Sequence, residues 1–136
     1  MASVYGKTYI KPHESFLNME GAAVNLAGAA ADVTAWRMPA TIAIQGFSLV
    51  VTTTINGAAN APVLALDWAP ETGVGRAEIV RITIPHGTLA GSVIQRLLQA
   101  PVTVPYGSAL ILEHVTAATI AGGAKLMPLL RSLGTA

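Results

Sequence analysis

The chain has 136 residues, which suits a single domain with one hydrophobic core. It contains no cysteine, which excludes a disulfide framework, an iron–sulfur site and a cysteine nucleophile. Charged residues make up only 11% of the chain and the formal net charge is +1, so the composition lacks the basic surface that binds nucleic acid.

The longest uncharged stretch runs from residue 38 to residue 66, and it does not read as a membrane span. A spanning helix needs roughly 20 continuous apolar residues, whereas this stretch is interrupted by glutamine, asparagine, threonine, glycine and proline. Hydrophobic residues nevertheless make up 52% of the chain. Low charge combined with high apolar content predicts that other polypeptides cover much of the surface within an assembly.

Residues 1 to 20 differ from the rest of the chain. They combine several charged residues with the aromatic side chains of Tyr5, Tyr9 and Phe16. We interpret this segment as an extended N-terminal arm whose aromatic residues dock on another surface.

Residues 21 to 31, "GAAVNLAGAAA", are small and flexible. Alanine favours a helix, but the glycines leave too few residues for a stable one, so the stretch predicts a linker or a short helical turn. The expected organisation is an arm and linker over residues 1–31, followed by a β domain over residues 32–136.

The first half of this β domain reads as four strands separated by turn residues. The strands are expected at residues 32–37, 41–54, 63–68 and 76–84. In the second of them the apolar parity changes at Gly46, after Ile44 and before Phe47. A β-bulge at that glycine directs both apolar sets toward the core.

The stretch "SVIQRLLQA" at residues 92–100 fits two structures. Its apolar spacing suits a short helix that Thr88 caps, and it also suits a strand with Arg96 pointing outward. Strands on both sides of the stretch favour a strand.

The C-terminal part predicts a hairpin and a last strand. A strand is expected to begin at Pro101, to turn at residues 105–107 and to return over residues 108–115. A short final strand covers residues 125–131, and its Pro128 indicates a sheet edge. Seven or eight short strands with regular turns predict an all-β fold, namely an antiparallel β-sandwich or jelly-roll-like domain with an extended N-terminal arm.

No motif in the sequence points to catalysis or to metal binding. The motifs of serine hydrolases, nucleotide-binding loops and zinc proteases do not occur. His13, His86 and His114 are isolated from one another, and Glu113 faces away from His114 if both lie on one strand. We expect no catalytic residue, no metal ligand and no cofactor.

Two further groups of side chains have alternative interpretations. Trp36 and Trp68 lie in alternating apolar strands and are expected to belong to the core rather than to a sugar-binding site. Arg76, Arg81 and Arg96 fall on strands or at their ends. These arginines belong either to a solvated sheet face or to a surface that binds the carboxylates of an acidic partner.

The hairpin "APVTVPYGSALILEHVTAA" at residues 100–118 is followed by a glycine-rich turn and a short terminal strand, in a small cysteine-free β domain with an N-terminal arm. Together these features resemble the decoration, or cement, proteins of tailed bacteriophage heads. The similarity extends from Thr41 to Arg131. It implies a homotrimer on the outer surface of the virion that bridges neighbouring major capsid protein subunits, contacts neither nucleic acid nor membrane, and catalyses nothing.

The resemblance carries over no individual site residue. The candidates for contact with the capsid are Tyr5, Tyr9 and Phe16, which rest on the expected exposure of the arm. The alternative interpretations of the sequence are a carbohydrate- or ligand-binding β-sandwich module, a β-sandwich enzyme, or another phage structural part such as a fibre or connector protein.

Overall fold

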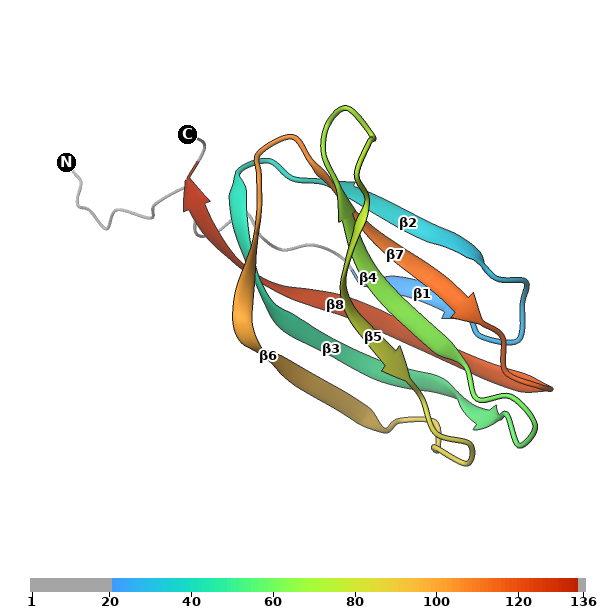
Figure 1. Ribbon diagram of the computed structural model, residues 1–136. Helices are drawn as coiled ribbons and strands as arrows, with labels where there is room; N and C mark the ends of the chain where they lie inside the picture. The colour runs from blue at the N-terminus through green and yellow to red at the C-terminus, as the bar shows by residue number, and fades with distance from the viewer. Residues whose placement is uncertain (1–20, 135–136) are drawn as a thin grey trace.

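The computed structural model describes residues 21 to 134, and every regular secondary-structure element in this range is a β-strand (Figure 1). The strands are β1 (Ala22–Asn25), β2 (Ala31–Arg37), β3 (Thr41–Asn56), β4 (Val63–Ala69), β5 (Ala77–Thr83), β6 (Val93–Val104), β7 (Ala109–Thr116) and β8 (Ala121–Gly134). Within this range the chain forms no helix of the length and apolarity needed to cross a membrane. The expected all-β class is confirmed.

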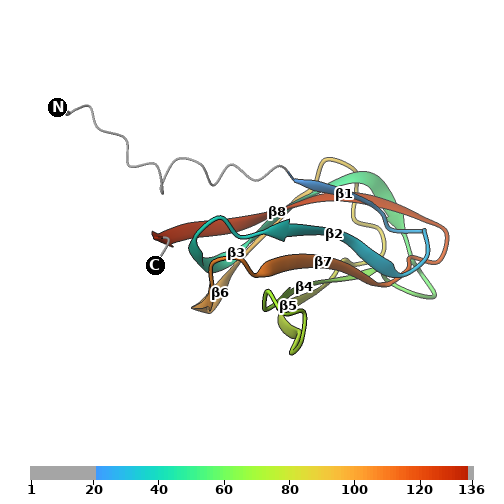
Figure 2. The ribbon, with the colours of Figure 1, turned by 90° about the horizontal axis from the view of Figure 1, so that it is seen from above.

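The strands form two four-stranded sheets. The first sheet has the order β1-β8-β3-β6 and the second has the order β2-β7-β4-β5. The strand pairs are nested in sequence order, each pair enclosing the next. Strand β1 pairs with β8, β2 with β7, β3 with β6 and β4 with β5, and every pair is antiparallel. This confirms the antiparallel β-sandwich, and the nesting is jelly-roll-like. Figure 2 shows β1 and β8 on one side of the molecule and β4 and β5 on the other.

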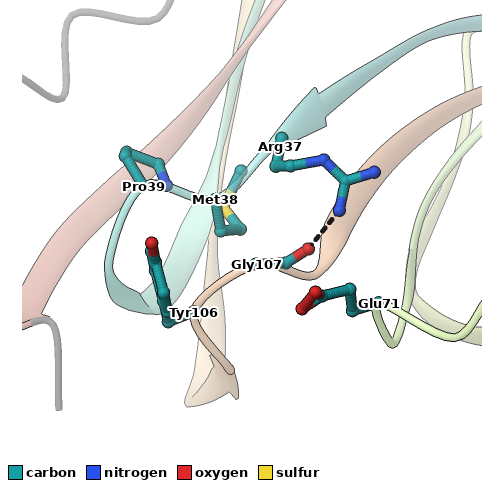
Figure 3. Close-up of a pocket in the computed structure, with 6 residues that line it drawn as sticks. All are labelled: Arg37, Met38, Pro39, Glu71, Tyr106 and Gly107. Atoms are coloured by element: carbon teal, nitrogen blue, oxygen red, sulfur yellow. Dashed lines mark hydrogen bonds between the residues drawn. The ribbon is translucent and has the colours of Figure 1, made fainter.

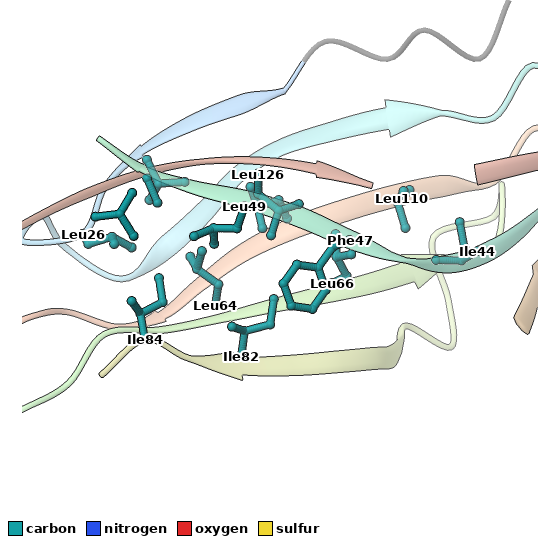
Figure 4. Close-up of a cluster of buried hydrophobic side chains, with 14 of the residues drawn as sticks. Leu26, Ile44, Phe47, Leu49, Leu64, Leu66, Ile82, Ile84, Leu110 and Leu126 are labelled. Carbon is teal, nitrogen blue, oxygen red and sulfur yellow. The ribbon is translucent and has the colours of Figure 1, made fainter. Parts of the chain in front are cut away.

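The core lies between the two sheets (Figure 4). Side chains alternate inward and outward along each strand. Phe47 and Leu49 of β3 and Leu126 of β8 therefore project from the first sheet into one cluster with Leu66 and Leu110 of the second sheet. All five side chains are fully buried, and each contributes about 1.5–3 kcal/mol of hydrophobic stabilisation.

The predicted bulge at Gly46 is confirmed. Ile44 pairs with Val102 of β6, but Gly46 pairs with Leu97, so four residues of β6 lie opposite a single residue of β3. The backbones approach so closely here that a Cβ on Gly46 would lie 2.1 Å from the carbonyl oxygen of Arg96. Only glycine fits this position, and the bulge brings Ile44 and Phe47 onto the same buried face.

The ambiguous stretch at residues 92–100 is a strand, which confirms the favoured alternative. The expectation that a separate strand begins at Pro101 is wrong, because β6 continues through this proline to Val104. Strand β6 is the last strand of the first sheet, and an edge strand tolerates a residue that has no N–H to donate.

The expected linker at residues 21–31 is wrong as well. Strand β1 pairs with β8 from Ala22 to Asn25, and Val24 and Leu26 are buried in the core. The sandwich therefore begins ten residues before the expected boundary at residue 32. Four small residues carry too short an alternation to distinguish a strand from a linker, so the pairing with β8 decides this structure. Residues 1–20, including the expected arm, lie outside the described residues.

The last strand is longer than its sequence suggests. Strand β8 has 14 residues and lies inside the first sheet between β1 and β3, rather than forming a short edge. Pro128 pairs with Phe47 of β3. Strand β1 reaches only to the position opposite Leu126, so on its other side Pro128 has no strand partner among residues 21–134. This local edge explains why the proline is tolerated.

Candidate functional site

The two sheets of the sandwich differ in charge. Every carboxylate among residues 21–134 lies on the second sheet or in the loop between β4 and β5; these residues are Asp32, Asp67, Glu71, Glu78 and Glu113. The strands of the first sheet carry three cations and no carboxylate; the cations are Arg96, Lys125 and Arg131. Among residues 21–134, the second sheet thus carries charges of both signs, whereas the strands of the first sheet carry only positive charges.

The strand register determines which side chains of the first sheet point outward. Directly paired residues share a face of the sheet, and the row of Leu49 and Leu126 points into the core. Rows alternate in direction along the strands, so the rows of Val50, Ser48 and Gly46 point outward. These rows consist of Val93, Val50 and Lys125, of Gln95, Ser48 and Met127, and of Leu97, Gly46 and Leu129. Arg131 and Leu133 continue the same alternation along β8. We call this surface the first-sheet face.

The first-sheet face exposes several large apolar side chains. Val93 and Leu97 on β6 are 65% and 68% exposed, and Met127 and Leu133 on β8 are 43% and 46% exposed. Leu129 is half-buried between them. An exposed apolar side chain is unremarkable when it is isolated, but neighbouring ones on one sheet face mark an interaction site.

Two cations on β8 flank Met127 and Leu129. Lys125, Met127, Leu129 and Arg131 alternate outward on β8, so Lys125 and Arg131 lie about 20 Å apart at 3.3 Å per residue. Neither cation forms an ion pair with the part of the chain that the structure describes. Arg96 faces the other way, with its guanidinium carbon 6.0 Å from the centre of the Phe47 ring.

The outer face of the second sheet carries an ion-pair cluster around Arg76. This arginine lies between the β4–β5 turn and β5, and its guanidinium donates to both carboxylate oxygens of Asp32, at 3.0 and 2.8 Å. Its Nε donates to Asp67 at 2.9 Å, and its Nη2 lies 3.4 Å from Glu113. Strands β2, β4 and β7 therefore each contribute one carboxylate to a single guanidinium.

The carboxylates of this cluster have opposite pKa shifts. The hydrogen bonds from Arg76 lower the pKa of Asp32. By contrast, a hydrogen bond with Asp67, burial and the negative charge of Asp67 raise the pKa of Glu113. The side chain of Asp67 is only 6% exposed, and its Oδ1 has no hydrogen-bond donor among the described residues. A proton on Glu113 supplies such a donor, which is the physical reason why the protonated form of Glu113 is favoured and its pKa is raised.

Arg81 is also paired within its own strand. Its guanidinium lies 2.9 Å from Glu78, which raises the pKa of Arg81 and lowers that of Glu78. Arg76 and Arg81 therefore bind carboxylates of their own chain, as expected for a solvated sheet face.

An open pocket of about 370 Å³ lies at one end of the sandwich (Figure 3). It is bounded by Met38 and Pro39 after β2, by Glu71 in the β4–β5 loop, and by Tyr106 in the β6–β7 turn. The guanidinium of Arg37 donates a hydrogen bond to the carbonyl oxygen of Gly107 across the pocket. The phenol of Tyr106 is 57% exposed, so the pocket offers one aromatic surface beside one cation.

The structure separates the histidines that the sequence singled out. His114 is buried on the inner face of β7, whereas Nδ1 of the exposed His86 accepts a hydrogen bond of 3.0 Å from the Gly57 N–H. His13 lies outside the described residues. Within residues 21–134, no three histidine or carboxylate side chains are arranged to hold a metal ion.

The structure places both tryptophans, whereas the arm residues lie outside its described range. Trp36 and Trp68 both pair with Leu110 and pack half-buried against the core, which is the placement expected for them. The capsid-contact candidates Tyr5, Tyr9 and Phe16 all lie outside the described residues, so their role stays a prediction.

The first-sheet face was missed in the sequence although its signal is present. Residues 93–97 and 127–133 contain the exposed apolar residues of this face, but apolar residues occupy both odd and even positions of each stretch. Periodicity alone therefore does not tell which parity faces the core. The pairing with β3 settles it, because Leu49 and Phe47 are buried and fix the inward rows.

Comparisons with protein families, with curated proteins and with solved structures found no match to this chain.

Proposed function

We propose that this chain is a non-catalytic structural protein of a bacteriophage particle, which binds the outer surface of the capsid and stabilises it by bridging neighbouring major capsid protein subunits. The observation that supports this proposal is the first-sheet face, where exposed apolar side chains such as Leu97 and Met127 lie beside cations that form no ion pair among residues 21–134. Such a surface is costly in water and becomes favourable when a protein partner covers it.

The fold is compatible with this function but does not decide it. Jelly-roll-like sandwiches occur in viral shells, in lectins and in enzymes, so function has to be argued from a surface. A sheet face that combines neighbouring exposed apolar residues with charges has the composition of a protein–protein interface. Repeated weak contacts over a capsid then give slow dissociation without any single strong contact.

We also propose that the chain assembles as a homotrimer. The low charge and high apolar content of the chain support self-association, because they leave few ionic side chains to solvate every outer face of a monomer. Light scattering on the purified full chain is expected to give three times the chain mass of 14.0 kDa. A single species at the chain mass would reject the trimer.

Co-sedimentation tests the capsid function directly. The full chain is mixed with capsids assembled from the major capsid protein encoded in the same genome and is separated on a density gradient. We expect the chain to migrate with the capsids and to raise the temperature at which they disrupt. If the chain stays at the top of the gradient, the proposed function is wrong.

A second candidate, a ligand-binding β-sandwich module, is supported by the end pocket. Tyr106, Arg37 and Glu71 provide an aromatic surface, a cation and a carboxylate, which can stack against and hydrogen-bond a sugar. Titration with glycans while recording tryptophan fluorescence tests this candidate, because Trp36 neighbours Arg37 on β2. A saturable change that Tyr106→Ala removes would favour it over the capsid function.

A further inference from the structure

We propose that the first-sheet face is the surface that docks on the partner protein, and that the partner patch is acidic with an apolar centre. The inference rests on the proposed function and specifies which side of the sandwich meets the shell. Leu97 and Met127 become buried at the centre of the contact, while Lys125 and Arg131 meet carboxylates of the partner.

Strand β8 presents apolar residues and cations together on its outward side. Lys125 and Arg131 point to the same side as Met127 and Leu129, with the two apolar residues between the two cations. The face is continued across β3 to β6, where Val93 and Leu97 are the most exposed apolar residues of the sheet. A partner that covers this face therefore needs an apolar centre between two anionic positions that lie about 20 Å apart.

The arginines of the second sheet and the cations of the first sheet differ in whether they have carboxylate partners among residues 21–134. Arg76 and Arg81 on the second sheet already have carboxylate partners at 2.8 and 2.9 Å. Lys125 and Arg131 have none among the described residues, and no aspartate or glutamate occurs on any strand of their sheet. Charge complementarity therefore selects a partner that brings its own carboxylates.

Within residues 21–134, a second copy of the chain offers no carboxylate on the same sheet. A twofold contact places the same face on both sides, and it brings the cations at the two ends of β8 against one another. Like charges facing each other across an interface are unfavourable. The carboxylates of the second sheet are engaged by Arg76 and Arg81, so they offer little to a neighbouring copy. The capsid protein is therefore the occupant that the charges favour.

Charge-matched variants of the full chain test the proposal in the co-sedimentation assay. Lys125→Gln and Arg131→Gln each remove one positive charge from the face, whereas Arg96→Gln removes one positive charge from the same sheet but from the opposite side. We expect each face variant to weaken capsid binding about tenfold and Arg96→Gln to bind as the unaltered chain does. Leu97→Ser is expected to weaken binding similarly with unchanged thermal unfolding, since the side chain is exposed.

Zero-length coupling of amines to carboxylates provides a measurement that needs no variant. On assembled particles, we expect the amine of Lys125 to be joined to aspartate or glutamate residues of the capsid protein. The coupled peptides are identified by mass spectrometry.

The outcomes separate the two proposals. If the unaltered chain does not bind capsids, the capsid function and the inference resting on it both fail. If the chain binds but the face variants bind equally well and Lys125 is not coupled, the function stands and the docking face is wrong. Binding of the unaltered chain to anionic lipid vesicles that equals its capsid binding, and that depends on Lys125 and Arg131, would also overturn the acidic protein partner in favour of a membrane.

Discussion

Arg76 and Asp32 form a two-pronged ion pair across the outer face of the second sheet, although 44 positions separate them in the chain. The same guanidinium reaches Asp67 of β4, whose side chain is almost fully buried. The pair therefore fixes the start of β2 against the turn that precedes β5. It also gives a nearly buried carboxylate its counter-charge, which is the condition under which burying a charge is tolerated.

Replacing Arg76 by alanine is expected to destabilise the domain. The change leaves the Asp67 carboxylate buried without its charged donor, and an unsatisfied buried acceptor costs about 1–3 kcal/mol. Urea unfolding followed by circular dichroism measures the loss. Arg81→Ala is the matched control, because its partner Glu78 is exposed and the pair contributes little. Equal unfolding midpoints for the two variants would contradict this role of Arg76.

Replacing Glu113 by glutamine is expected to flatten the dependence of stability on pH. In the folded protein the pKa of Glu113 is raised above its ordinary value of 4.5. Between that value and the raised pKa the folded state binds more protons than the unfolded state, so stability falls as the pH rises through this window. The glutamine amide donates to Asp67 at every pH and removes this loss.

The pH effect of Glu113 is distinguishable from that of the other carboxyls. The pKa values of Asp32 and Glu78 are lowered by Arg76 and Arg81, so their stabilisation is present above the ordinary pKa and is lost as the pH falls. Unfolding free energies measured at several pH values above 4.5 are therefore expected to decline with pH in the unaltered chain and to decline less in Glu113→Gln. Parallel curves would show that the pKa of Glu113 is not raised in the folded protein.

Replacing Gly46 by alanine is expected to cost at least about 2 kcal/mol of unfolding free energy. The added Cβ would lie 2.1 Å from the Arg96 carbonyl oxygen, and backbone atoms of β6 cannot yield without breaking the ladder. Gly87→Ala is the control, since Gly87 also has a positive φ but open space around its Cβ, and its cost is about 1 kcal/mol. Similar costs for both variants would mean that the close approach at Gly46 does not matter.

The sequence predicted the fold class and many strands because their signals are local. The turn residues between β3 and β4 and the change of parity at Gly46 are visible in a single stretch of chain. Strand β1 and the length of β8 were missed because they depend on pairing between residues about 100 positions apart, such as Val24 with Ala124. No local pattern contains that information.

The candidate site was predictable only in part, for the same reason. Low overall charge indicated a covered surface, but it did not locate that surface. Leu97 and Leu98 are adjacent and equally apolar, and only the bulge opposite Gly46 and the register with β3 place Leu97 outward while Leu98 packs on the core. The lack of carboxylates on the strands of the first sheet emerges only when the nested strand order assigns each strand to a sheet.

Oxidation of methionine on the assembled particle tests the central claim most directly. Met127 is 43% exposed at the centre of the first-sheet face, whereas Met38 is fully buried and serves as an internal control. With dilute peroxide and mass spectrometry, we predict that Met127 is oxidised readily in the free chain and is protected in the capsid-bound chain, while Met38 stays unreactive in both. Equal oxidation of Met127 in the free and capsid-bound states would contradict the claim that a partner covers this face.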